Sequence, residues 1–131
     1  MKYHNLVKAA RKAIKFSYSP YSRFRVGAAV LTASGKIYTG CNIENSSFSL
    51  TICAERTALF KAVSERHRKF RAIAIVSDNK EFTPPCGACR QVMLELAGDI
   101  DVILSNANGN TKIVKLNTLL PIPFDAKTLK H

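Results

Sequence analysis

The stretch Cys53-Ala54-Glu55-Arg56 decides how the rest of the chain is interpreted, because it sets a thiol two residues before a carboxylate at the start of a helical pattern over 54–63. A second stretch, Pro85-Cys86-Gly87-Ala88-Cys89-Arg90, spaces two more thiols as C-x-x-C. It also opens a helical pattern, over 87–96. The two stretches together supply three thiols and one carboxylate.

Outward from these stretches, apolar runs predict the remaining elements. Apolar residues at helical spacing over 6–14 predict an amphipathic first helix that ends near 17–20. The runs 24–32 and 37–43, joined by Ser34-Gly35, predict a hairpin. Further strands are expected at 72–76, 102–104 and 112–114, the last two separated by the turn Asn108-Gly109.

Strands alternate with helices in the middle of the chain, and this order favours a mostly parallel sheet covered by helices on both faces. The first hairpin adds an antiparallel pair. We therefore expect an α/β fold, a three-layer α/β/α sandwich around a mixed five-stranded sheet. With 131 residues, 47% of them apolar, the chain is expected to form a single catalytic domain over 1–131.

The chain contains no run of about 18 apolar residues, and its first residues lack the apolar stretch of a secretion signal. We expect a cytoplasmic protein without membrane contact. In that reducing compartment, four cysteines favour free thiols or metal ligands over disulfides.

A net charge of +11 raises the possibility of nucleic-acid binding. The basic residues are mostly scattered, however, and the densest cluster, over 66–71, reads as a solvated loop between a helix and a strand. No regular basic face with interleaved aromatic residues is visible. We therefore expect no nucleic-acid partner.

Cys53, Cys86 and Cys89 each lie where a predicted helix begins, so unpaired N–H groups and the helix dipole favour thiolates. Three thiolates leave a tetrahedral zinc ion one open position for water, as in catalytic sites, and Glu55 is its natural neighbour. One alternative is a closed structural site with Cys41 as the fourth ligand. Another is a set of buried cysteines that only pack.

The order C-x-E followed by P-C-x-x-C matches the zinc-deaminase signature with Cys in place of His. With it come SPYSRFRVGAAVL (19–31), GCNIENSSFS (40–49), CAERTALFKAVSE (53–65), PCGACRQV (85–92) and LLPIPF (119–124). The sequence resembles the cytidine deaminases, of the homotetrameric type with three cysteine ligands, nearly from end to end.

The resemblance implies that Cys53, Cys86 and Cys89 bind one Zn²⁺ per chain and that Glu55 shuttles protons for a zinc-activated water. The reaction would be hydrolytic deamination of cytidine and deoxycytidine to uridine and deoxyuridine, in pyrimidine salvage. An alternative keeps the zinc chemistry but changes the substrate to a cytosine-containing antibiotic or nucleic acid. A non-enzymatic, zinc-stabilised binding module predicts four sulfur ligands and no role for Glu55.

Further site residues follow from the resemblance. Arg56 would offset the net negative charge of three thiolates on Zn²⁺. Phe24 would pack on the base, Asn42 and Glu44 would hold the ribose hydroxyls, and Ala54 would offer its N–H to the ring carbonyl. A carboxylate at Glu44 would also repel a phosphate and so select free nucleosides. Phe124 is expected to cover the base from a neighbouring subunit.

Three positions depart from the family pattern. Phe48 stands where a Tyr is common, which removes a hydroxyl near the sugar. Arg25 and Pro84 replace a usual Pro and Ser. None of these three touches the predicted zinc ligands or Glu55.

Overall fold

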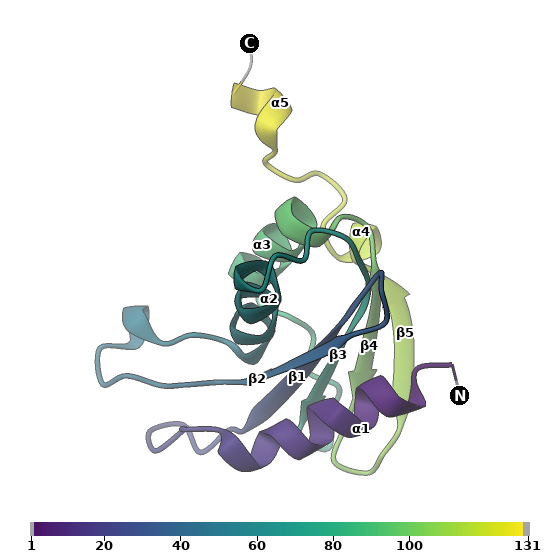
Figure 1. The fold of residues 1–131 in the computed structure, drawn as a ribbon. Helices are drawn as coiled ribbons and strands as arrows, with labels where there is room; N and C mark the ends of the chain where they lie inside the picture. The colour runs from purple at the N-terminus through teal and green to yellow at the C-terminus, as the bar shows by residue number, and fades with distance from the viewer. Residues whose placement is uncertain (1, 130–131) are drawn as a thin grey trace.

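A five-stranded sheet in the order β2-β1-β3-β4-β5 runs through the centre of the computed structural model, which describes residues 2–129 (Figure 1). The strands occur at the predicted places and extend one or two residues beyond most of them. They are β1 (Val26–Thr32), β2 (Ile37–Cys41), β3 (Phe70–Ser77), β4 (Asp101–Ser105) and β5 (Thr111–Lys115).

The prediction of a mostly parallel sheet is wrong, because β3 and β4 form the only parallel pair among the four pairings of this sheet. The helix after β2 does return the chain in the same direction, so β2 and β3 point the same way. They are not neighbours, however, because β1 lies between them and pairs antiparallel with both. The prediction of a mixed five-stranded sheet is confirmed.

Helix α1 (His4–Ala13) covers one face of the sheet and continues as the 3-10 helix η1 (Ile14–Phe16), as the predicted end near 17–20 requires. Its apolar stripe packs on small strand residues, so the helix approaches closely. The buried cluster on this face consists of Tyr3, Leu6, Val7, Ala10, Ala29, Ala72, Ala74, Val76 and Ile103.

Helices α2 (Ala54–Ser64) and α3 (Gly87–Ala97) cover the opposite face (Figure 1). The core there uses larger side chains, among them Leu59, Ile73, Ile75, Met93 and Val102. Because strand side chains alternate between faces, the apolar run of β3 serves both cores, and the three-layer sandwich is confirmed.

Two glycines allow the helices to lie this close to the sheet. A Cβ at Gly27 of β1 would come within 3.0 Å of the backbone atoms Ala10 O in α1 and Ile14 N at the start of η1. A Cβ at Gly40 of β2 would meet Ala58 N and Ala54 O of α2 in the same way. Each glycine therefore sets the spacing of one layer.

Two segments project from this body. The loop between β2 and α2, which contains the 3-10 helix η2 (Phe48–Leu50), extends sideways, and the chain after α4 (Leu116–Leu119) extends away to α5 (Ala126–Leu129) (Figure 1). Helix α4 was not predicted. Within residues 2–129, no helix has both the length and the apolar composition that crossing a membrane requires.

Candidate metal centre and substrate pocket

The three predicted ligand sulfurs lie together. The Sγ atoms of Cys53, Cys86 and Cys89 are all within 4.8 Å of one another, and those of Cys53 and Cys86 are 3.7 Å apart. Two sulfurs at about 2.3 Å from a tetrahedral zinc ion are separated by about 3.8 Å. The soft donor set and this spacing therefore fit one zinc ion.

Helix ends position the sulfurs. Cys53 and Cys86 occupy the N-cap positions of α2 and α3, and Cys89 lies in the first turn of α3, where its N–H points at Cys86 Sγ at 3.4 Å. Unpaired N–H groups and the positive end of each helix dipole favour thiolates at these places. The predicted electrostatic environment of the ligands is therefore present.

The thiols of Cys53 and Cys89 have opposite pKa shifts. The Cys89 thiol donates a hydrogen bond toward Cys53, and together with the Arg56 guanidinium this lowers the pKa of Cys53 to about 5. The same hydrogen bond, together with burial, raises the pKa of Cys89. These opposite shifts make Cys53 the first thiolate of the set.

Glu55 lies in the first turn of α2 with only 4% of its surface exposed. Burial raises the pKa of this carboxyl to about 7, and the charge of the Cys53 thiolate adds to the rise. A carboxyl with a pKa near neutrality can both accept and return a proton. This pKa suits the proton shuttling that the resemblance implies for Glu55, and that role stays a prediction.

Glu55 faces a pocket of about 180 Å³ beside the sulfurs. Four predicted site residues line it together with Cys53 and Cys86, namely Phe24, Asn42, Ala54 and Glu55, and Val26, Thr51, Ile52, Thr83 and Pro84 complete the wall. Most of the lining is apolar, which suits a planar base with a few polar contacts.

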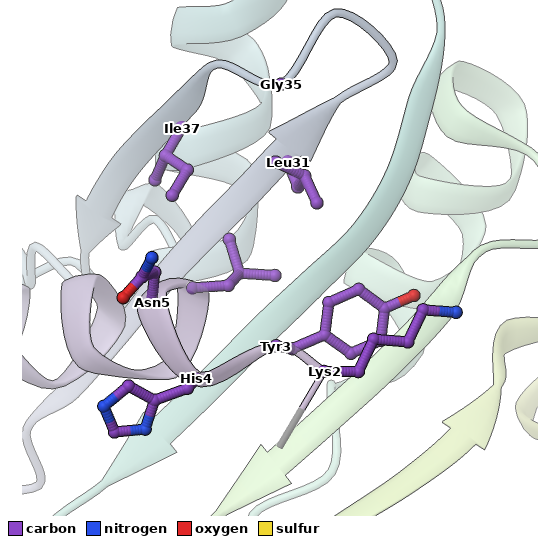
Figure 2. A pocket seen from close by; sticks show the side chains of 8 residues that line it. Lys2, Tyr3, His4, Asn5, Leu31, Gly35 and Ile37 are labelled. Atoms are coloured by element: carbon purple, nitrogen blue, oxygen red, sulfur yellow. The ribbon is translucent and has the colours of Figure 1, made fainter.

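A larger hollow of about 480 Å³ lies elsewhere, between the start of α1 and the β1–β2 turn (Figure 2). Lys2, Tyr3 and His4 line it on one side, and Leu31 and Ile37 on the other. None of the predicted site residues takes part, so size alone does not identify the functional pocket.

Comparison with known proteins decides the family. The family profile described as "Cytidine and deoxycytidylate deaminase zinc-binding region" matches residues 1–105. The cytidine deaminase of Halalkalibacterium halodurans is 52% identical over 125 residues, which are 95% of this chain and 95% of that protein. The chain belongs to the cytidine and deoxycytidylate deaminase family.

Two further relatives agree with this assignment. The cytidine deaminase of Sporosarcina psychrophila is 47% identical over 132 residues, covering 100% of this chain and 97% of that protein. The crystal structure of the cytidine deaminase from Burkholderia pseudomallei superposes with a TM-score of 0.91 at 46% identity, covering 95% of this chain and 100% of that one. The chain thus has the deaminase fold, its zinc cofactor and the hydrolase class of its family.

The two arginines that follow the ligand motifs play different parts in the deaminase. Arg56 Nη2 lies 3.6 Å from Cys53 Sγ, whereas its buried Nε has no hydrogen-bond partner in the described chain. Arg90 instead donates to Pro85 O at 2.7 Å and to Leu119 O at 2.9 Å. Of these two arginines, Arg56 therefore contacts a sulfur of the cluster, while Arg90 ties the Cys86 loop to the end of α4.

Asn42 ties the loop before β1 to the end of β2. Its Oδ1 accepts hydrogen bonds from Val26 N at 3.0 Å and Ser17 Oγ at 2.5 Å, and its Nδ2 donates to Phe24 O at 2.7 Å. An amide nitrogen has two protons, so one donor position is left for a ligand. These three hydrogen bonds hold the Asn42 side chain in one position at the pocket wall.

Glu44, two residues after Asn42, is buried but does not line the pocket in the single chain. Its Oε1 accepts from the N–H groups of Tyr21 at 3.0 Å and Ser22 at 3.1 Å, and its Oε2 accepts from Ser22 Oγ. These bonds, that of the Ser22 hydroxyl above all, hold the pKa of the Glu44 carboxyl below its usual range. Sequence reasoning missed Ser22, although the quoted SPYSRF run contains it.

Cys41 does not belong to the sulfur cluster. It ends β2, donates to Phe16 O at 3.2 Å and lines a separate hollow with Lys61, so the closed four-cysteine site is excluded. Phe124 is 58% exposed on the C-terminal segment and lies outside the pocket of its own chain.

The three departures lie around the site. Arg25 pairs with Asp78 at 3.1 Å, and its N–H, which a proline would lack, faces Asp78 Oδ1 at 3.4 Å. Phe48 packs edge-on against the Tyr21 ring at 6.4 Å between centroids, away from the pocket. Pro84 belongs to the pocket wall, whereas Arg25 and Phe48 do not.

Proposed function

We propose that this deaminase converts cytidine and deoxycytidine to uridine and deoxyuridine, with release of ammonia, as a step of pyrimidine salvage. One observation carries the proposal: three clustered sulfurs lie beside a buried carboxyl, whose pKa is raised to about 7, at the wall of a small apolar pocket. The relatives at 52% and 47% identity bear the name cytidine deaminase.

Cys53, Cys86 and Cys89 would hold one zinc ion. Bound there, zinc supplies a water molecule acidic enough to serve as a nucleophile near neutral pH. Glu55 would accept a proton from the attacking water and pass it to the ring nitrogen next to the amino-bearing carbon. It would then take the proton of the new hydroxyl group on that carbon and give it to the amino group, so that the carbon–nitrogen bond breaks and ammonia leaves. The burial of Glu55 excludes bulk water, and its pKa near 7 suits transfer in both directions.

The pocket residues orient the nucleoside. Phe24 packs against the base, and the N–H of Ala54 at the start of α2 donates to the ring carbonyl. The remaining Asn42 Nδ2 proton and Glu44 Oε2 meet the sugar hydroxyls. The Glu44 carboxylate disfavours a phosphate at this place, so the proposal selects nucleosides over nucleotides.

Arg56 is proposed to lower the negative charge that three thiolates place around the metal. Its guanidinium at 3.6 Å from Cys53 Sγ is the support, because hydrogen bonds to ligand sulfurs withdraw charge from the site. Without this positive charge, the three thiolates would oppose the loss of a proton from a water on the metal.

We also propose that residues 1–131 form one catalytic domain that assembles into a cytoplasmic homotetramer, with Phe124 covering the base of a neighbouring subunit. The C-terminal segment supports this, because it extends from the body with Ile122, Phe124 and Leu129 at least 58% exposed (Figure 1). Four cysteines without a disulfide fit a reducing compartment. Sedimentation velocity tests the assembly, and Phe124→Ala should then raise KM.

The decisive experiment measures deamination of free cytidine, by absorbance and ammonia release, on protein with quantified zinc. For Glu55→Gln we expect kcat to fall by about 10³-fold or more with zinc and fold retained, because only the proton shuttle is removed. Glu65→Gln, at the exposed C-terminal end of the same helix, is the matched control and should retain full activity.

Deoxycytidine, cytidine monophosphate and a cytosine-containing oligonucleotide complete the substrate panel. Turnover of both nucleosides but not of the phosphorylated substrates is expected. Zinc-loaded wild-type protein that leaves cytidine unchanged would refute the proposed substrate, and full activity of Glu55→Gln would refute the proposed proton shuttle.

A further inference from the structure

Ser22 lies in the turn before β1, where one hydroxyl joins two residues of the proposed nucleoside site. Its Oγ donates to Glu44 Oε2 and accepts a hydrogen bond from Phe24 N at 3.0 Å. The proposed function places Glu44 on the sugar and Phe24 on the base. A single side chain thus connects the groups that recognise the two halves of the substrate.

The Glu44 carboxylate is nearly saturated inside the chain. Its Oε1 accepts two backbone N–H groups, from Tyr21 and Ser22, and its Oε2 accepts the Ser22 hydroxyl. A carboxylate has about four acceptor positions, so one is left, on Oε2 beside the Ser22 hydroxyl. The direction of this open position therefore depends on where Ser22 holds Oε2.

The Phe24 backbone is fixed from both sides. Ser22 Oγ accepts from its N–H, and Asn42 Nδ2 donates to its carbonyl oxygen at 2.7 Å. The residue between Ser22 and Phe24, Arg23, has a φ of +59°, in the left-handed region that residues other than glycine rarely adopt. Strained positions of this kind persist where surrounding contacts hold them, and here the hydroxyl spans the turn.

We propose that Ser22 is a positioning residue for substrate recognition: its hydroxyl sets the open acceptor position of Glu44 toward a sugar hydroxyl and holds Phe24 over the base. The inference rests on the proposed function. It adds that sugar and base recognition are coupled, because the same hydroxyl serves both.

Steady-state kinetics of zinc-loaded Ser22→Ala test the proposal. With cytidine we expect KM to rise about tenfold and kcat to change less than about twofold, since a hydrogen bond to a charged group is lost away from the reacting atoms. Ser22→Thr keeps the hydroxyl and should restore the wild-type KM. Ser34→Ala removes a hydroxyl from the β1–β2 turn and is the matched control.

A second substrate distinguishes a positioning role of Ser22 from a general loss of rigidity in the site. With 2′,3′-dideoxycytidine, which lacks both ring hydroxyls, Ser22→Ala should raise KM by clearly less than with cytidine. Ser22→Cys keeps the size of the side chain but donates weakly, and it replaces the alanine variant if that one does not fold. An unchanged KM with cytidine, or an equal loss with both substrates, would overturn the proposal.

Binding of the product uridine, measured by calorimetry, distinguishes this proposal from the proposed function. If the wild-type protein does not deaminate cytidine, the proposed function fails by itself. Weaker uridine binding by Ser22→Ala than by wild-type protein would still sustain the role of Ser22. Equal binding, or no binding to either protein, would overturn it.

Discussion

The two faces of the sheet are built alike but serve different purposes. Each is covered by helices over a buried apolar cluster, and each depends on one glycine, Gly27 under α1 and Gly40 under α2. The α1 face has alanines on the strands and a helix that lies along the sheet. The α2–α3 face presents two helix N-termini with three thiols. The two faces therefore pack in the same way. Only the α2–α3 face brings two helix N-termini together, and the three thiols lie there.

The direction of the strands explains this difference. β2 and β3 both run antiparallel to β1, so their carboxyl ends lie at the same edge of the sheet. The chain leaves both strands there and enters α2 and α3, which brings the two helix starts together, as ligand sites in open α/β sheets require. α1 precedes the sheet and has no such partner.

The largest effect is expected from a variant that removes one sulfur from the α2–α3 face. Cys89→Ser should reduce zinc from about one ion per chain to near zero and deamination by about 10³-fold or more, because a third thiolate is needed for the site. Metal analysis and kinetics measure both. Cys41→Ser is the matched control and should keep its zinc; loss of zinc there would contradict the three-sulfur site.

The two glycines compare the faces directly. Gly27→Ala and Gly40→Ala should each lower the free energy of unfolding by about 3 kcal/mol, because the added methyl meets helix backbone. Urea unfolding measures this loss. Zinc affinity should fall only for Gly40→Ala, since that methyl displaces α2, whose N-cap is the ligand Cys53. Equal zinc affinity in both variants would show that the metal site tolerates a shift of α2.

A smaller effect is expected at the rim of the metal centre. Arg56→Gln should lower zinc affinity about 10-fold to 100-fold, because Arg56 helps to lower the pKa of Cys53 and zinc binds the thiolate. Competition with a chelator measures the affinity. Arg71→Gln, which removes a side-chain hydrogen bond to the Ala33 carbonyl oxygen, provides the comparison and should bind zinc like the wild type.

The smallest effect belongs to the α1 face. Tyr3 donates to Asp101 Oδ2 at 2.6 Å, and Tyr3→Phe should cost about 1 kcal/mol of unfolding free energy at neutral pH, with activity unchanged. That hydrogen bond, ahead of the one from Lys115, lowers the pKa of Asp101, so the difference should vanish as the pH falls through the folded-state value.

The same pair gives an alkaline test. Burial, followed by the Asp101 contact, raises the pKa of Tyr3 to about 12. A raised pKa stabilises the fold below the unfolded value of about 10, and this contribution is lost as the pH rises through 12. Unfolding curves of wild type and Tyr3→Phe should therefore converge at both extremes, and a constant difference would exclude the linkage.

Local patterns predicted much of this molecule. Apolar periodicity placed five strands and three long helices within a few residues, because burial on one or two faces leaves a readable repeat. The C-x-E and P-C-x-x-C motifs predicted the three sulfurs that the structure brings together and pointed to Glu55 beside them, because thiols at helix starts suit a zinc ion. Helix α4 was missed because its four residues leave no repeat.

Strand pairing and the support around the pocket came only from the tertiary structure. No local signal places β1 between β2 and β3, because hydrogen bonding between distant strands depends on the whole chain. The same is true of the bonds that Ser22 and Asn42 make with the segment before β1. The sequence by itself determined the reactive groups and their helices, and the three-dimensional packing decided which of them meet.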